Sequence, residues 1–219
     1  MEQLRRKWHD LWKRINAIGN PDTIFNEIRV AYNNPPRPYH SLEFHIQKGL
    51  QIFEKVRPRL REPDKVELAF WLHDAKSDEF ASACFAIGLI ENMDMRISFS
   101  RDILRLIGKT CYHKRIIASE NDEQYLVDID LSILGASRNE YLDYASRVAE
   151  EYAHVPPKEF CRRRAIILEE FLEQRCVDER CGIIKSIYHT GYFRERYEAQ
   201  ARKNLRDEIR WLRAKLAKV

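Results

Sequence analysis

Glycine is scarce in this chain of 219 residues: it occupies 7 positions, or roughly 3%, which is less than half the usual share of about 7%. β-Sandwiches need a turn every ~8–12 residues, and many turn types depend on glycine. Phosphate-binding backbone loops need several glycines close together. The shortage therefore disfavours both kinds of structure and, with 44% hydrophobic residues available for a core, favours a helical globular fold.

Long apolar runs are also missing. The longest stretch without a charged residue, Phe80 to Ile90, has 11 positions, whereas a helix that crosses a bilayer needs about 18 or more. The basic N-terminus passes into an amphipathic pattern instead of the apolar core of a secretion signal. We therefore expect a cytoplasmic protein that does not cross a membrane.

Cysteine pairs that would indicate a disulfide framework or a zinc site are absent. The five cysteines are odd in number and form no CxxC motif, so we expect reduced, mostly buried thiols. Cys176 and Cys181 could contribute to a metal site, but no second pair completes it. The formal net charge of +4 is compatible with anionic small molecules and with nucleic acid, and it selects neither.

Apolar residues recur at helical spacing through most of the chain, which predicts an all-α fold. We expect helices at about residues 4–15, 22–32, 41–53, 64–75, 79–92, 100–112, 123–134, 139–152, 157–173 and 195–216. The proline-rich segment from Asn33 to Pro38 is expected to be an extended loop. The sequence contains no repeat and no clear domain boundary.

Polar side chains able to bind a metal stand on segments that are otherwise apolar. His73 and Asp74 end a predicted helix that is apolar on all sides and should therefore be buried. The carboxyl end of a helix favours a cation, and imidazole and carboxylate groups suit Zn²⁺, Fe or Mn²⁺. Without other candidate ligands nearby, a His-Asp pair is more simply explained as a core histidine that is hydrogen-bonded to an aspartate capping the helix. The wider set of candidates is His40, His45, His73, Asp74, His113, Asp128 and Asp130.

A histidine, a His-Asp pair and an aspartate on separate apolar helices resemble the HD-domain phosphohydrolase superfamily. More narrowly, the chain is similar to small bacterial proteins described as predicted metal-dependent HD phosphohydrolases. The matching segments are Arg37–Leu42, Val66–Ala75, Asp128–Gly135 and scattered tail positions between Ile187 and Glu208. The resemblance implies a single all-α HD-type domain over residues 1–219, with a helical-bundle core at about 37–150 and flanking helices in 1–36 and 151–219.

The resemblance also implies a ligand set for a divalent metal ion. His45, His73, Asp74 and Asp130 would bind it, and Asp128 is the weaker of the two aspartate candidates. One or two ions of Mn, Fe, Zn, Mg or Co are compatible with these ligand types.

Three further residues are implied to take part in catalysis. His40 resembles the acid of the His-Asn-x-x-His motif of cyclic-nucleotide phosphodiesterases, but His45 follows one position later than in that motif, so the roles of His40 and His45 could be exchanged. Glu79 could orient a metal-bound water or a histidine, or it could be a solvated residue at a helix start. His113 occupies the position at which relatives carry a histidine near the substrate phosphate.

The implied activity is metal-dependent hydrolysis of a phosphomonoester or phosphodiester by metal-activated water, with nucleotides among the small phosphorylated substrates. The alternative is a degenerate HD domain that binds a nucleotide or metal as a sensor or interaction module. In the C-terminal segment Arg194–Lys218, nine basic residues stand against four acidic ones. An apolar stripe runs along the same segment, so docking on the core and a homodimer contact are both favoured over nucleic-acid binding.

Overall fold

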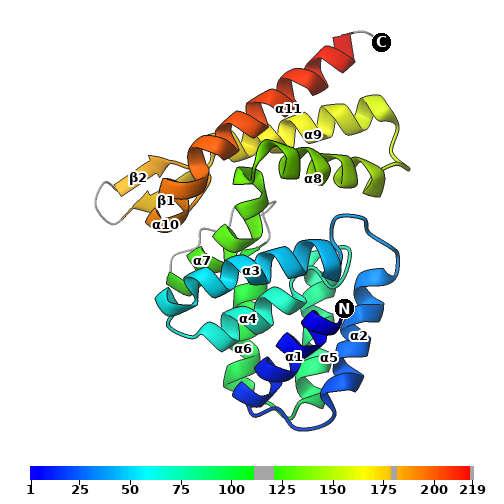
Figure 1. Cartoon of the computed structure of the whole chain (residues 1–219), viewed down its shortest axis with the longest axis vertical. Coiled ribbons are helices and arrows are strands. Elements are labelled where there is room, and N and C mark those ends of the chain that lie inside the picture. Colours follow the sequence, from blue (N-terminus) through cyan, green and yellow to red (C-terminus); the bar gives the residue numbers. More distant parts are fainter. Residues whose placement is uncertain (111–120, 179–181, 218–219) are drawn as a thin grey trace. The chain divides into compact units, whose positions relative to one another are not determined.

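A computed structural model describes residues 1–110, 121–178 and 182–217 of the chain (Figure 1). The fold is all-α, as predicted, and the sheet within the described residues has two short strands. Residue contacts divide the chain into two compact units, Met1–Asp130 and Leu131–Val219. This division falls inside the segment 37–150 that we expected to form the core.

The first unit is built from seven helices in the described residues. They are α1 (Glu2–Arg14), α2 (Pro21–Asn33), α3 (Gln47–Val56), α4 (Pro63–Leu72), α5 (Glu79–Asn92), α6 (Ile97–Lys109) and α7 (Asn121–Leu131), whose last residue belongs to the second unit. A π-helical turn, η1 (Leu42–Ile46), precedes α3, and a 3-10 turn, η2 (Arg57–Arg59), follows it. Helix α4 contacts α1, α3, α5 and α6, and in Figure 1 it lies between α3 and α6.

Helix α4 forms the centre of the first unit, which confirms the prediction from its apolar sequence. Every residue from Val66 to Leu72 is buried. The one charged residue among them, Glu67, forms ion pairs with Arg14 and Arg57, which offset the cost of burying its carboxylate. The α-helix ends at Leu72 instead of Ala75, so His73 and Asp74 lie in the turn that follows it.

A glycine allows α3 to approach α4 closely. Gly49 faces Phe70, and a Cβ atom at position 49 would lie 2.0 Å from the ring of Phe70. His45 lies one turn before Gly49, and His73 follows Phe70 by three positions. The contact between Gly49 and Phe70 therefore brings the segments that carry these two histidines together.

The second unit consists of helices and one hairpin in its described part. Its elements are η4 (Ser132–Gly135), α8 (Arg138–Glu151), α9 (Pro157–Glu173), β1 (Arg175–Asp178), β2 (Gly182–Lys185), α10 (Gly191–Phe193), η5 (Arg194–Glu198) and α11 (Ala199–Ala217). The strands are antiparallel, with Cys176 opposite Ile184. We did not predict this hairpin, because each strand has four residues and is too short to show a clear alternation.

Two residues of the tail, Glu198 and Asn204, bond to the backbone of other segments of the second unit. The side-chain amide of Asn204 donates to the carbonyls of Leu134 and Ala136, both at 2.9 Å. The carboxylate of Glu198 accepts from the backbone amides of Ile187 and Tyr188, at 3.1 Å and 3.3 Å. These residues therefore have structural roles within this unit.

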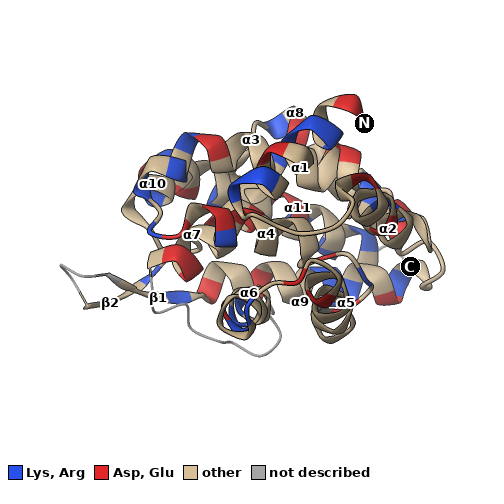
Figure 2. Cartoon of the chain, turned by 90° about the horizontal axis from the view of Figure 1, so that it is seen from below, with Lys and Arg blue, Asp and Glu red and all other residues tan. Residues whose placement is uncertain are grey.

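Helix α11 buries its apolar stripe within the second unit, where α11 and α9 lie side by side (Figure 1). Several of its basic residues have acidic partners, including Arg202 with Glu198 at 2.7 Å and Arg213 with Glu169 at 2.6 Å. Figure 2 shows basic and acidic residues interleaved along the helices. This pattern is typical of a solvated helix face.

Among the described cysteines, Cys161 and Cys176 are buried and Cys84 is exposed, all as free thiols, while Cys111 and Cys181 lie outside the described residues. No helix in the described part of the chain combines the length and the apolar character needed to cross a bilayer.

Candidate metal centre

His45 lies near the end of the short π-helical turn η1, and the start of this turn is capped. Ser41 caps this turn, because its hydroxyl oxygen accepts from the amide of Phe44 at 3.3 Å. His45 is 5% exposed. Its Nδ1 atom lies 3.2 Å from the hydroxyl of Tyr39, which leaves Nε2 to face the interior. Short π-helical stretches of this kind are frequent at functional sites.

His73 and Asp74 are positioned by the end of α4. His73 is 1% exposed, and its Nδ1 atom lies 2.9 Å from the carbonyl oxygen of Phe70. A carbonyl can only accept, so Nδ1 carries a proton and Nε2 of the neutral ring has a free lone pair. The side chain of Asp74 is 24% exposed. The turn after α4 thus presents a nitrogen and a carboxylate oxygen to the same space.

These groups meet Asp130 from α7. The ligand atoms of His45, His73, Asp74 and Asp130 all lie within 4.8 Å of one another, and this is the candidate metal centre. The two Nε2 atoms are 3.2 Å apart. Asp130 Oδ1 lies 3.2 Å from His45 Nε2 and 3.4 Å from His73 Nε2. Asp74 Oδ2 lies 3.4 Å and 3.3 Å from the same two nitrogens.

These distances match those between the ligand atoms of a bound divalent cation. In a tetrahedral site with metal–ligand distances of about 2.0–2.1 Å, neighbouring ligand atoms are about 3.3–3.4 Å apart. The nitrogen–nitrogen and nitrogen–oxygen distances at the candidate metal centre are 3.2–3.4 Å. Two imidazoles and two carboxylates also match the ligand types of borderline metals. The group could therefore hold a metal ion.

The electrostatics of the centre favour positive charge. Burial by itself would lower the pKa of His45 and His73, but Asp130 and Asp74 outweigh it, so the pKa of His45 is raised and that of His73 is raised well above its ordinary value. Burial would likewise raise the pKa of Asp74 and Asp130, yet the neighbouring histidines lower both. A site that stabilises imidazolium in this way also attracts a divalent cation.

The four predicted metal ligands are thus brought together, whereas the other candidates lie differently. Asp128 is fully buried and sits two positions before Asp130, about 200° away around the helix. Accordingly, Asp130 belongs to the group of ligand atoms and Asp128 does not. His40 lies at the edge: its Nε2 is 3.9 Å from Asp74 Oδ2, and its side chain is 28% exposed.

Two predicted catalytic residues lie outside the part of the chain that is described. These are His113, in the segment 111–120, and the side chain of Glu79 at the start of α5. Sequence reasoning also missed two residues beside the centre, Arg37 and Tyr39. Both belong to the segment Arg37–Leu42, one of those on which the family resemblance rests, and this was the feature of the sequence that could have indicated them.

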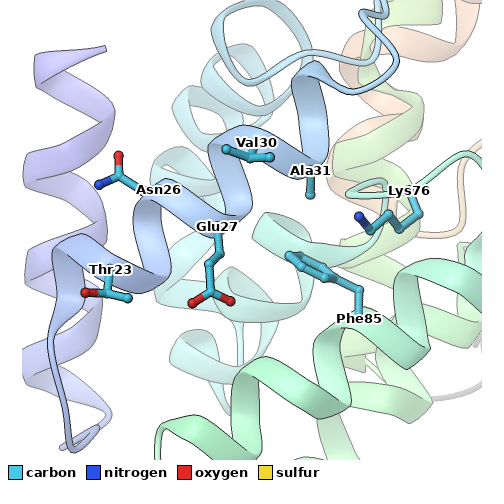
Figure 3. Close-up of a pocket in the computed structure, with 7 residues that line it drawn as sticks. All are labelled: Thr23, Asn26, Glu27, Val30, Ala31, Lys76 and Phe85. Carbon is cyan, nitrogen blue, oxygen red and sulfur yellow. The ribbon is translucent and has the colours of Figure 1, made fainter.

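A separate pocket of about 500 Å³ lies elsewhere in the first unit. Figure 3 shows Phe85, from α5, and Lys76 pointing toward α2. The ammonium group of Lys76 lies 4.7 Å from the centre of the Phe85 ring. The lining residues are Thr23, Asn26, Glu27, Val30, Ala31, Lys76 and Phe85. None of them is a ligand of the candidate metal centre.

No known family model matches the chain, and no curated protein or solved structure is significantly similar to it. The fold and the site define a helical protein with a candidate metal centre.

Proposed function

We propose that this chain is a metal-dependent phosphohydrolase of the HD-domain type. The observation that carries the proposal is the convergence of His45, His73, Asp74 and Asp130 in a buried site. A divalent ion bound there would lower the pKa of a bound water toward ~7 and offset charge on a phosphoryl group. The substrate would be a phosphomonoester or phosphodiester, with nucleotides among the candidates.

The chain's own residues would bind the ion and move a proton. His45 and His73 would bind through Nε2, since their Nδ1 atoms face Tyr39 and Phe70. The carboxylates of Asp74 and Asp130 would balance the charge of the ion. His40, partly exposed at the edge of the centre, is suited to donate a proton to the leaving oxygen.

Further roles follow from the resemblance. His113 would contact the substrate phosphate, and Glu79 would orient a ligand or a water molecule. The mixed nitrogen and oxygen donors suit Mn, Fe, Zn or Co better than Mg, which prefers oxygen donors alone. The group of four ligands accounts for one ion, and a second would need ligands in addition to these.

The test is elemental analysis of the purified protein, followed by hydrolysis assays on nucleotides and phosphomonoesters with added Mn²⁺, Mg²⁺, Fe²⁺ or Co²⁺. His73→Ala and Asp74→Ala should each abolish metal content and hydrolysis while leaving the helical circular dichroism largely intact. His9→Ala is the matched control, because His9 also pairs with an aspartate, Asp22 at 3.0 Å, but outside the candidate metal centre.

Hydrolysis that persists in both the His73 and Asp74 variants would refute the proposal. Metal-loaded protein that is inactive on the whole substrate panel would instead indicate a binding module, in which the centre holds a metal or nucleotide without turnover.

A further inference from the structure

The hydroxyl of Tyr39 faces one metal ligand directly. Tyr39 is 5% exposed, and its oxygen lies 3.2 Å from Nδ1 of His45. Its ring packs edge-on against His40 and Phe44, with centroids 4.6 Å and 5.8 Å away, which fixes where the hydroxyl points. When this oxygen accepts the Nδ1 proton of His45, the lone pair of Nε2 is directed at the candidate metal centre.

Arg37 bonds to the turn after α4, which carries the two candidate ligands His73 and Asp74. Its guanidinium group donates to the carbonyl of Lys76 at 2.8 Å and to the carbonyl of Asp74. It also lies over the ring of Tyr32, 5.5 Å from the centroid. The hydroxyl of Tyr32 in turn donates to the carbonyl of Trp71 at 3.1 Å.

These bonds bracket His73 and Asp74. The carbonyl of Trp71 is among the last of α4, which have no partner within the helix, and the carbonyls of Asp74 and Lys76 follow in the turn. External donors therefore fix the geometry of this segment. The planar fork of an arginine can bond two carbonyls at once. Arg37 and Tyr32 together hold the backbone on both sides of the His-Asp pair.

We propose that Arg37 and Tyr39 are positioning residues of the candidate metal centre. Tyr39 selects the tautomer of His45, and Arg37 fixes the turn so that the carboxylate of Asp74 faces the two histidines. This inference rests on the proposed function, because it assumes that the centre binds a metal ion. Partners of this kind typically change metal affinity by about 10–100-fold.

The charge of Arg37 makes the proposal distinguishable from a simple electrostatic effect. A positive guanidinium near the centre repels a cation, so electrostatics alone predicts that its removal strengthens metal binding. Positioning predicts the opposite, because a loosened turn no longer presents Asp74 correctly. The direction of the change in affinity therefore identifies the role.

The experiment is a titration of metal-free, full-length protein with Co²⁺, followed by the visible absorption of the bound ion. We expect Tyr39→Phe and Arg37→Met each to weaken binding by about 10–100-fold and to alter the absorption bands. Arg37→Lys keeps the charge but replaces the two nitrogens of the rigid fork, one for each carbonyl, by a single flexible ammonium group, so it should not restore the affinity.

The second unit offers matched controls. Tyr141→Phe removes a buried hydroxyl that donates to the carboxylate of Glu208 at 2.5 Å. Arg196→Met removes a guanidinium that lies 4.2 Å from the ring centroid of Tyr192 and donates to its carbonyl. Both controls should bind Co²⁺ like the parent protein. Thermal unfolding with a chelator measures any general loss of stability separately.

The outcomes separate the inference from the proposed function. If the parent protein binds Co²⁺ and the variants of Arg37 and Tyr39 bind it equally well or more tightly, the inference is wrong and the metal centre stands. If the parent protein binds no Co²⁺, the centre and the inference both fail. Tyr39→Phe removes a single oxygen atom, so it keeps the test decisive should Arg37→Met not fold.

Discussion

At the scale of single residues, the centre depends on which nitrogen or oxygen faces it. His73 presents Nε2 because the carbonyl of Phe70 occupies Nδ1, and His45 presents Nε2 because Tyr39 occupies its Nδ1. The same two nitrogens lie within 3.2–3.4 Å of Asp74 and Asp130. A change of one atom at any of these groups should therefore alter metal binding.

The two aspartates of α7 provide a direct test at this scale. Asp130→Asn removes a charged ligand with little change in shape, so we expect metal content to fall to a small fraction of the parent value. Asp128→Asn should keep its metal, because Asp128 is not one of the ligand residues. Elemental analysis of the folded proteins measures both. Equal loss in the two variants would contradict the assignment of Asp130 as the ligand.

At the scale of elements, the contact between α3 and α4 brings the two histidines together. Phe70 of α4 fits against Gly49 of α3, and the Phe70 ring also stacks on His73 with centroids 4.9 Å apart. Helix α4 is buried on every side, so it can only shift slightly. The separation of the histidines is thus a property of helix packing.

Gly49→Ala tests this dependence. The added methyl group would lie 2.0 Å from the Phe70 ring, so either the ring or α3 must shift. We expect a loss of about 1–3 kcal/mol in the free energy of unfolding and weaker metal binding, measured by denaturant titration and Co²⁺ titration.

Gly88→Ala is the matched control for Gly49→Ala. Gly88 also lies in a helix, but a Cβ atom there meets nothing within 4 Å. It should be neutral or raise stability by up to about 1 kcal/mol, because alanine is the better helix former. Unchanged metal affinity in Gly49→Ala would show that the histidines do not depend on this contact.

At the scale of the whole molecule, all four ligands belong to the first compact unit, Met1–Asp130. They come from η1, the turn after α4, and α7, which are far apart in the sequence. Metal binding would therefore connect distant segments of this unit and stabilise its folded state over the unfolded chain.

Adding the metal should accordingly raise the unfolding temperature. A ligand at 100 times its Kd that binds only the folded state contributes about 2.7 kcal/mol. We expect this gain with Co²⁺ or Mn²⁺, its reversal by a chelator and its absence in His73→Ala, all measured by thermal unfolding. A gain that survives in His73→Ala would place the metal elsewhere in the protein.

Sequence periodicity alone predicted most of the helices and the central place of α4, because a helix that is apolar on all sides has to be buried. It did not predict the hairpin of β1 and β2, which is too short to produce a periodic signal. The sequence also indicated the residue types of the centre, since histidines and aspartates on apolar helices are costly to bury without a partner. The single-domain interpretation stays a prediction.

Only the tertiary structure decided which segments of the chain meet at the candidate metal centre. The sequence left the roles of His40 and His45 open, and only the packing of Gly49 against Phe70 places His45 next to His73. The resemblance already favoured Asp130 over Asp128, and the helical rotation of α7 places Asp130 in the group of candidate ligands. The sequence marks Arg37 only as part of the matching segment Arg37–Leu42, and it does not indicate which backbone carbonyls Arg37 bonds, because a carbonyl is present at every residue. Periodicity fixes which side chains are buried, whereas the distances between segments depend on packing.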